Sequence, residues 1–410
     1  MASDSSNGLN VSVVGAGIAG LTAAIALGRN GHHVQIFEKS ESKTEIGVAL
    51  GVPLNALRVL DQLGITRKNL KGVPWSGGVA FDAESGEDTI GHQVADYLGV
   101  ADYLVADSMP ARGWSTAGPD QMIGLLCHRS DLYGELKRVA TGPGQGPPAK
   151  LHLGTKVVAC DSEAGTIFFT SGEVLHADLV LGADGSVVGT HVLGEVQKAL
   201  PWGVSCYRTV FKLPPLSGMR WLDDGVSGTK TLLNFIAVFT DSHEDVQGCT
   251  PTASREDIIA KFRSFHPKFL PVFDLPAHSE IFKWQLGVLP LLPTWIRGRT
   301  ALLGDAAHAT LPFMAQGAAM AVEEGGSLGC LFPTGTRPED VPQRLKAYQD
   351  IRKQRGEFVR NESAEQLKNL MCGGPVVRYR DIQPTLLQYD ALATARDCYE
   401  ERFGDKSLSE

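Results

Sequence analysis

Three glycines and one acid near the N-terminus have the spacing of a dinucleotide-binding turn. Gly15, Gly17 and Gly20 form the pattern G-x-G-x-x-G between an apolar strand and a helix. Gly15 permits the tight turn, Gly17 lets the backbone approach a pyrophosphate, and Gly20 lets the helix pack closely on the strand. Glu38, at the end of the next strand, is expected to be exposed and to accept hydrogen bonds from a ribose, with Lys39 beside it. These five residues are predicted to bind FAD or NAD.

A second motif far along the chain favours FAD. The segment TALLGDAAH (300–308) places a strand and a glycine turn before an acid and another helix. Because an acid would repel a diphosphate, we expect Asp305 to accept a hydrogen bond from a ribityl hydroxyl instead. The next helix opens at Gln316, Gly317 and Ala318, and its first N–H groups could face the pyrimidine edge of a flavin. His308 is predicted to be a packed or phosphate-proximal residue rather than a catalytic base.

The elements that position these motifs begin with a βαβ unit. Residues 11–14 (VSVV) have the composition of a buried parallel strand, and a small-residue helix and the strand VQIFEK follow them. Residues 56–64 and 130–141 show helical spacing, and the first of these helices ends at Gly64. Two helices, at 315–330 and roughly 338–370, are predicted to complete the chain. This order predicts an α/β fold with a Rossmann-like FAD-binding domain.

A second lobe is predicted from residues rich in β-forming and aromatic types. The segments CYRTVFKL, TLLNFIAVFT and IFKWQLGVL, separated by proline-containing turns, favour a mostly antiparallel sheet. Shorter strands at 151–160, 166–171 and 177–185 are expected to rejoin the first domain. We therefore divide the chain into an FAD-binding domain (1–80, 120–190 and 297–370), an interleaved substrate domain (81–119 and 191–296) and a C-terminal segment (371–410).

Composition narrows the class of protein. The net charge is −8 and no long basic cluster is present, which argues against nucleic acid as a partner. Seven scattered cysteines without a C-x-x-C pair argue against a disulfide scaffold, a bound metal and a dithiol redox centre. The polar N-terminus does not resemble a signal peptide, and the longest apolar stretch (300–322) carries Asp305, His308 and Gln316. We expect a cytoplasmic protein with no membrane span.

Taken together, the motifs closely resemble the class A flavoprotein monooxygenases, the family of salicylate hydroxylase and para-hydroxybenzoate hydroxylase. The resemblance covers nearly the whole chain: GAGIAG with FEK, EIGVALGVPLNALRVLDQLG, CHRSDLYGEL, DLVLGADG and GDAAHATLPFMAQGAAMAVEEG. It implies the para-hydroxybenzoate hydroxylase fold. It also implies that Arg129 lies along the FAD, that Ala49 contacts FAD through its backbone, and that Asp184 lies near the FAD and nicotinamide phosphates. The alternative for Arg129 is a surface ion pair at a helix start.

The same resemblance implies a mechanism. NADPH or NADH reduces FAD, O₂ adds to form a flavin C4a-hydroperoxide, and one oxygen atom passes to an electron-rich carbon of a small aromatic substrate. A fungal type of specialised metabolism is implied, with hydroxylation or epoxidation of the substrate. An FAD-dependent oxidase or desaturase on the same fold is the alternative, and an FAD-binding protein without activity is a further one. The sequence leaves the substrate, the choice of nicotinamide and the oligomeric state open.

Substrate-binding residues are predicted on one strand of the second lobe. Tyr207 and Arg208 are adjacent, so their side chains point to opposite faces of a sheet. The resemblance implies that Arg208 is the catalytic, substrate-binding residue, where it could bind a carboxylate or stabilise a phenolate. A solvent-facing arginine is the alternative. Trp284 is expected to line the pocket or to lie in the core.

Four departures from the family pattern predict a specialised cavity. GADGSVVGT lacks the usual basic residue after the second fingerprint, WQLGVLPLLPTW lacks an acid–arginine pair, GTKTLL lacks a tyrosine, and Leu54 replaces a common proline. Other classes of enzyme fit less well. Gly325–Gly329 matches the G-x-S-x-G of hydrolases, but it follows a helical segment and no histidine occurs after His308. A disulfide reductase needs a cysteine pair, and a flavin halogenase needs a W-x-W motif; both are missing.

Overall fold

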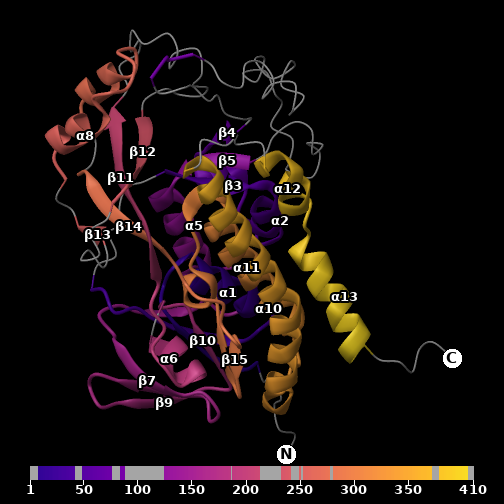
Figure 1. Ribbon diagram of the computed structural model, residues 1–410. Coiled ribbons are helices and arrows are strands. Elements are labelled where there is room, and N and C mark those ends of the chain that lie inside the picture. The colour runs from indigo at the N-terminus through magenta and orange to yellow at the C-terminus, as the bar shows by residue number, and fades with distance from the viewer. Residues whose placement is uncertain are drawn as a thin grey trace, which may run out of the picture.

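The computed structural model describes residues 8–41, 49–75, 84–87, 124–185, 187–212, 232–241, 249–250, 253–277, 280–371 and 378–404. Figure 1 shows a molecule built from several sheets with long helices along one side. Most of the predicted substrate-domain segment 81–119, and most of the segment GTKTLL, lie outside the described residues. The proposed division into domains therefore stays a prediction.

A mostly parallel sheet of six strands carries the nucleotide-binding motifs. Its strands are β1 (Asn10–Val14), β2 (His33–Phe37), β6 (Lys150–His152), β10 (Leu179–Gly182), β15 (Ile296–Arg297) and β16 (Thr300–Leu302). They lie in the order β15-β16-β10-β1-β2-β6, and β15 is the antiparallel member. After Asn10, every residue of β1 is buried. Burial on both faces explains why this strand reads as a continuous apolar run, and the predicted α/β fold class is confirmed.

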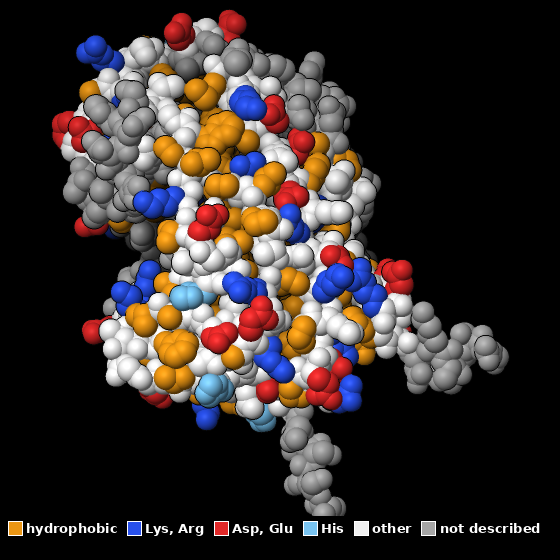
Figure 2. All heavy atoms as spheres, turned by 60° about the horizontal axis from the view of Figure 1, so that its bottom comes forward, with side chains coloured by type: hydrophobic (Ala, Val, Ile, Leu, Met, Phe, Trp, Pro, Cys, Tyr) orange, Lys and Arg blue, Asp and Glu red, His pale blue; other side chains and the backbone are white. Residues whose placement is uncertain are grey.

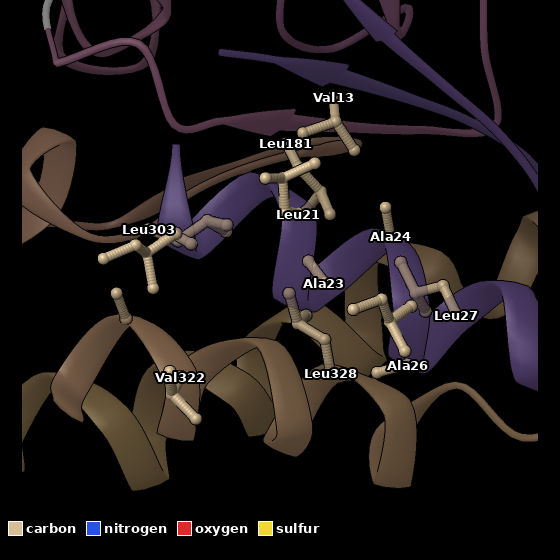
Figure 3. Close-up of a cluster of buried hydrophobic side chains, with 14 of the residues drawn as sticks. Val13, Leu21, Ala23, Ala24, Ala26, Leu27, Leu181, Leu303, Val322 and Leu328 are labelled. Carbon is tan, nitrogen blue, oxygen red and sulfur yellow. The ribbon is translucent and has the colours of Figure 1, made fainter. Parts of the chain in front are cut away.

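Two helices that pack closely against each other lie beside this sheet. These are α1 (Ile18–Arg29) and α10 (Gly317–Leu331), and Figure 3 shows Ala23, Ala26 and Leu328 at their interface. A Cβ atom on Gly325 would lie 2.7 Å from the backbone nitrogen of Ala23. One on Gly329 would lie 2.8 Å from the Cβ of Ala26. Glycine at both positions therefore lets the two helix backbones approach more closely than larger residues would allow.

Further helices surround this pair. The helix α5 (Arg129–Thr141) packs against α1, whereas α2 (Leu54–Gln62) and α13 (Ala391–Phe403) pack against α10. As predicted, the first helix after the βαβ unit ends near Gly64, which has a φ of 74°. Shorter helices are α3 (Arg67–Leu70), α6 (Val187–Leu193) and α9 (Asp305–His308), with the 3₁₀ turns η4 (Pro312–Met314) and η5 (Pro338–Asp340).

An antiparallel sheet of four strands forms the predicted second lobe. It contains β11 (Leu200–Lys212), β12 (Leu232–Thr240), β13 (Cys249–Thr250) and β14 (Phe282–Val288), in the order β12-β11-β14-β13. One face packs against α8 (Arg255–Phe262) and the 3₁₀ helix η3 (Leu270–Asp274), which Figure 1 shows on the outer side of the sheet. Tyr207 lies in this apolar cluster. The next residue, Arg208, therefore belongs to the opposite face of the sheet.

Two small antiparallel sheets complete the β structure. One contains β3 (Ala49–Pro53), β4 (Val73–Trp75) and β5 (Gly124–His128), and the other β7 (Val157–Asp161), β8 (Thr166–Phe169) and β9 (Val174–His176). The sequence did not predict the first of these sheets. Its strands ALGVP and VPW contain glycine or proline and show no alternation of apolar and polar residues. Their pairing depends on contacts between residues far apart in the chain.

The C-terminal region contains more helix than was predicted. After α11 (Val341–Met371) come α12 (Arg378–Leu387) and α13, so the two predicted final helices are followed by two more. The Asp390 side chain caps α13 by accepting hydrogen bonds from the N–H groups of Leu392 and Ala393. Arg344 on α11 lies 5.0 Å from the Tyr399 ring and 4.9 Å from the Phe403 ring. These contacts bind α13 to the rest of the protein.

The distribution of charged side chains on the surface agrees with a sequence that has no long basic cluster. Figure 2 shows Lys and Arg side chains mixed with Asp and Glu side chains over the face that it presents, without a continuous basic patch. Exposed apolar side chains on the small sheet of β7, β8 and β9 include Val158, Phe168 and Val174. Among the described helices, none has the length and apolar character needed to cross a membrane.

Candidate active site

The first glycine turn has the steric features that its spacing predicts. Gly15 has a φ of 104°, and a Cβ atom there would lie 2.4 Å from the carbonyl oxygen of Ala183. A Cβ atom on Gly20 would lie 2.1 Å from the carbonyl oxygen of Gly15, so both positions require glycine. One on Gly17 would meet nothing within 4 Å. The turn is therefore closed at Gly15 and Gly20 and open at Gly17, where a ligand could approach the backbone.

Glu38 is buried, with 5% of its surface exposed, which corrects the expectation of an exposed carboxylate. Its Oε2 accepts a hydrogen bond from the N–H of Ala16, and its Oε1 accepts one from Ser40, both at 3.0 Å. These two hydrogen bonds hold the Glu38 side chain against the glycine turn and keep it buried. Each carboxylate oxygen can accept more than one hydrogen bond, so the predicted ribose contact is compatible with this position. Lys39, the next residue, is exposed.

Asp184 lies beside the same turn, at the end of β10. Its Oδ2 accepts a hydrogen bond from the N–H of Val187 at 2.7 Å. Its Oδ1 is buried and has no hydrogen-bond partner among the described residues. Burial raises the pKa of Asp184, and the hydrogen bond from Val187 opposes that effect. An acceptor oxygen without a partner fits a site that is completed by a ligand hydroxyl or amide.

The turn that carries Asp305 packs against the start of α1. Gly304 has a φ of 59°, and a Cβ atom there would lie 3.0 Å from the Cβ of Ala19. Asp305 is the first residue of α9 and is exposed. This arrangement brings the second motif next to the glycine turn, although Asp305 lies 285 positions after Gly20 in the chain. The predicted site residues of the two motifs therefore lie in one region.

The N-terminus of α10 completes this region. Ala315, just before the helix, has a φ of 50°, and Gln316 is the N-cap residue. Neither α1 nor α10 has a side-chain cap or an acidic residue in its first turn. A Cβ atom on Gly317 would meet nothing within 4 Å. Two uncapped helix N-termini, one beside the open Gly17 and one beside Gly317, fit the diphosphate and the electron-rich ring edge of FAD.

Behind these turns, α10 carries two adjacent buried carboxylates that sequence reasoning missed. Glu323 binds Arg352 at 2.7 Å, Arg355 at 3.1 Å and the amide of Asn55 at 2.6 Å. Burial raises the pKa of Glu323, but the two arginines lower it more, so it stands below its usual value. The available signal was the pair of glutamates inside an apolar, glycine-rich helix, where a charge requires a buried partner.

Glu324, the second of these carboxylates, contacts the Asp305 turn. Its Oε2 accepts a hydrogen bond from the N–H of Gly304 at 2.7 Å, and its Oε1 lies 2.6 Å from the Nε2 of His308. Burial lowers the pKa of His308, but Glu324 raises it more, so it stands above its usual value. His308 also packs 5.4 Å from the Trp295 ring. It is therefore a packed, ion-paired residue, in line with the prediction that it is no catalytic base.

Arg208 joins the antiparallel sheet to β3. Its Nη2 donates a hydrogen bond to the carbonyl oxygen of Ala49 at 2.8 Å, and its guanidinium lies 5.6 Å from the Trp284 ring. Its Nε is buried and has no partner among the described residues. Burial lowers the pKa of Arg208, and the nearby charge of Arg129 lowers it further. Arg208 and Arg129 thus bring two positive charges to this part of the molecule.

Ala49 itself is held by both of its backbone groups. The N–H donates to the Oδ1 of Asn234 on β12 at 3.3 Å, while the carbonyl accepts from Arg208 on β11. Its backbone therefore contacts the antiparallel sheet, and the implied contact with FAD stays a prediction. Tyr207, on the other face, stacks on Phe239 at 4.6 Å. Of the two adjacent residues, only Arg208 is directed toward the junction with β3.

Two other features, a buried serine and a small cavity, offer no alternative active site. Ser327, the centre of the G-x-S-x-G match, is fully buried inside α10 and donates a hydrogen bond to the carbonyl of Glu323. A hydrolase nucleophile would have to be exposed at a turn between a strand and a helix. A cavity of about 10 Å³ lies among residues 289–292, Trp295 and His308. That volume holds no more than a water molecule, so it is too small for a substrate.

Family models match both ends of the predicted cofactor site. An NAD(P)-binding Rossmann-like domain matches residues 13–43, and an FAD binding domain matches residues 234–363. The first covers the glycine turn with Glu38 and Lys39. The second covers the Asp305 turn and the start of α10. FAD is therefore the cofactor, as the second motif predicted.

Individual relatives agree with these models. The chain is 35% identical over 423 residues to hispidin-3-hydroxylase from Neonothopanus nambi, with 94% of each chain covered. It is 31% identical over 386 residues to FAD-dependent monooxygenase cfoG from Aspergillus candidus, covering 87% of this chain and 84% of the relative. A salicylate hydroxylase structure shares the fold, with a TM-score of 0.71 at 22% identity over 96% of this chain and 98% of that one. The chain thus has the fold of salicylate hydroxylase, belongs to the FAD-dependent monooxygenases, and is an enzyme.

Proposed function

We propose that this monooxygenase hydroxylates a flat, electron-rich aromatic compound that carries an ionised or strongly polar group. The observation that carries the proposal is the position of Arg208, whose guanidinium lies beside Trp284 and bonds to Ala49 at the junction with β3. That junction joins the antiparallel sheet to the elements that carry the predicted cofactor contacts. A substrate bound there would lie between a cationic group and the cofactor.

The cofactor contacts are proposed as a set. When bound and reduced by NADPH or NADH, FAD would activate O₂, so that one oxygen atom enters the substrate and the other leaves as water. The uncapped N-termini of α1 and α10 would stabilise its negative groups, and the carboxylate of Asp305 would accept a hydrogen bond from a hydroxyl of its chain. The residues proposed to bind FAD are Gly15, Gly17, Gly20, Glu38, Lys39, Ala49, Arg129, Asp184, Asp305, Gly317 and Ala318.

The chemistry of the Arg208 face supports an anionic, aromatic substrate. Arg208 has a buried Nε without a partner among the described residues, and the charge of Arg129 acts on it. A phenolate or carboxylate would accept a hydrogen bond from the Nε of Arg208 and would be attracted by the charge of both arginines. In a phenolate, the negative charge also raises the electron density of the ring carbons, which favours transfer of oxygen to the ring. Arg208 would therefore orient the substrate and hold it in the reactive ionised form.

Apolar side chains near Arg208 would provide a wall for a ring. Phe282 and Trp284 stack with 5.8 Å between ring centroids and 23° between ring planes. Ile236 lies directly opposite Arg208 on β12 and keeps 43% of its surface exposed. Directly paired residues of neighbouring strands share one face of a sheet, so these side chains lie on the Arg208 side. They are proposed to pack against the substrate.

Hispidin is the first compound to test, because the relative named for it is 35% identical over nearly the whole chain. The enzyme would be loaded with FAD and given NADPH or NADH under ¹⁸O₂, with hispidin and a panel of phenols and indoles. Nicotinamide oxidation, hydrogen peroxide and product mass would be followed together. Substrate-dependent oxidation with one ¹⁸O in the product supports the proposal. Turnover without nicotinamide, with one peroxide per product, would instead indicate an oxidase.

We also propose that the enzyme works in the cytoplasm, on the evidence of its cysteines. Within the described part of the chain, Cys127, Cys160, Cys330 and Cys398 are free thiols. Free thiols are typical of reducing compartments. Fractionation of cells that express the tagged protein tests this proposal, and recovery in a secreted or vesicular fraction would contradict it.

A further inference from the structure

We propose that Glu324 is a positioning residue, which holds the 304–308 turn so that Asp305 is directed at FAD. The inference rests on the proposed role of Asp305 as a cofactor contact. Glu324 is fully buried in α10 and does not itself reach the exposed region where Asp305 lies. Its effect on the cofactor would therefore pass through the turn.

The two oxygens of Glu324 bracket Asp305 in the sequence. Oε2 accepts from the N–H of Gly304, the residue immediately before Asp305, at 2.7 Å. Oε1 lies 2.6 Å from the Nε2 of His308, three residues after it. One side chain thus fixes both ends of the short segment that contains the acid.

Few local interactions would hold this segment otherwise. The helix α9 has four residues, and its N-cap, Gly304, has a φ of 59° and a ψ of −140°. Glycine at such an angle leaves the chain a wide choice of conformations before the helix starts. Backbone bonds from the N–H groups of Ala307 and His308 to the carbonyl of Gly304 close the turn, but they do not fix its direction relative to α10. Glu324 supplies that link.

Glu324 and His308 are buried together, and this burial restricts the orientation of the 304–308 turn relative to α10. The side chains of His308 and Glu324 are 4% and 0% exposed, and α10 is packed on α1, so the carboxylate has little freedom to move. A buried carboxylate that lost either contact would have an unsatisfied oxygen, which is costly. The turn is therefore held in one orientation. Glu323, the neighbouring carboxylate, points to Arg352, Arg355 and Asn55 instead, and we assign it no role in this turn.

A double-mutant cycle on FAD affinity tests the inference. The variants are Glu324→Ala, Asp305→Ala and the double substitution. The dissociation constant is obtained from the fluorescence of free flavin as the holoenzyme is diluted. Glu324→Ala is expected to weaken FAD binding about tenfold in the wild-type background and to have little further effect in Asp305→Ala, because coupled residues are non-additive. An equal loss in both backgrounds would overturn the inference.

Two further variants separate positioning from general stability. Glu324→Gln keeps the shape and both hydrogen bonds, since its amide oxygen can accept from Gly304 and its NH₂ can donate to neutral His308. It is expected to restore FAD affinity to within about threefold of wild type. Tyr348→Phe removes a buried hydrogen bond to the carbonyl of Leu302, on the strand that leads to the turn. It should lower the urea midpoint while leaving FAD affinity unchanged.

The outcomes distinguish the inference from the proposal on which it rests. If Asp305→Ala leaves FAD affinity unchanged, the proposed role of Asp305 fails, and the inference fails with it. If Asp305→Ala weakens binding but Tyr348→Phe weakens it as much as Glu324→Ala does, the effect is one of general stability and only the inference is overturned. Loss in Glu324→Ala, recovery in Glu324→Gln and no change in Tyr348→Phe would support it.

Discussion

The Nη2 of Arg208 donates a hydrogen bond to the carbonyl oxygen of Ala49, a residue 159 positions away in the chain, at 2.8 Å. The bond connects the antiparallel sheet with β3, so the proposed substrate residue and a proposed cofactor residue are in direct contact. An anionic substrate at Arg208 would have to share this guanidinium with the carbonyl. With the substrate at the proposed site, its occupancy and the position of β3 would be linked by one side chain.

Replacement of Arg208 is expected to separate substrate binding from cofactor binding. Arg208→Ala should lower kcat/KM for substrate-stimulated NAD(P)H oxidation by about a hundredfold, because removing one side of a buried charge pair costs several kcal/mol. FAD content should stay at the wild-type level. Tyr207→Phe, on the opposite face of the same strand, serves as the control and should be close to wild type. Unchanged kinetics in Arg208→Ala would move the substrate site elsewhere.

Removal of the Asp305 carboxylate is expected to reduce FAD content. Asp305→Ala should lose most of its bound FAD on gel filtration, since a charged acceptor for a cofactor hydroxyl is gone. Asp305 is exposed, so the melting temperature without cofactor should change little. The ratio of flavin to protein absorbance measures the outcome. A yellow, fully loaded variant would contradict the role given to this acid.

Gly17 and Gly20 are expected to respond differently to added side chains. At Gly17 an added Cβ atom meets nothing within 4 Å, so Gly17→Ala should preserve folding while FAD affinity falls tenfold or more because the diphosphate cannot approach. Gly20→Ala places a Cβ atom 2.1 Å from the carbonyl of Gly15 and should destabilise the protein by about 1–3 kcal/mol or more. Urea unfolding and FAD titration of both variants give the comparison. Equal destabilisation of the two would argue against an open site at Gly17.

The contribution of His308 to stability is expected to decrease as the pH rises. Its pKa in the folded protein is raised above the usual value of 6.5, so folding favours the imidazolium. The resulting stability is fully present below the unfolded pKa and is lost as the pH rises through the folded pKa. The free energy of unfolding of wild type and His308→Gln would be compared from about pH 5.5 to pH 9. We expect the difference to shrink toward the alkaline end; a constant difference would mean that packing alone matters.

Much of the fold could be predicted because its signals are local. The glycine turn, the buried strand at 11–14 and the helix that ends near Gly64 depend on residues that are close in sequence. The three long strands of the second lobe were identified for the same reason. By contrast, the sheet of β3, β4 and β5 pairs residues that are far apart, and its strands contain glycine or proline. No local pattern predicts such a pairing.

The site was predictable in its residue types and less so in its partners. Spacing identified the turn glycines Gly15 and Gly20, and the role of Asp305 stays a prediction. The burial of Glu38 follows from its bond to Ala16, which only the folded turn creates. The charges of Glu323 and Glu324 were visible in the sequence, yet their partners come from α11, α2 and the 304–308 turn. The spacing of residues in a sequence does not show which distant side chains become partners in the folded protein.

The close approach of α1 and α10 at Gly325 and Gly329 bears on the kinetics of cofactor uptake. Because the two helix backbones touch, their N-termini are fixed relative to each other by the protein core itself. A ligand that bridges them finds its two binding ends already at the required separation and loses little entropy in ordering the protein. FAD would then associate in a single fast phase, whose rate is proportional to FAD concentration. A larger residue in place of Gly325 or Gly329 would push α1 and α10 apart. FAD binding would then include a slow step whose rate does not depend on FAD concentration.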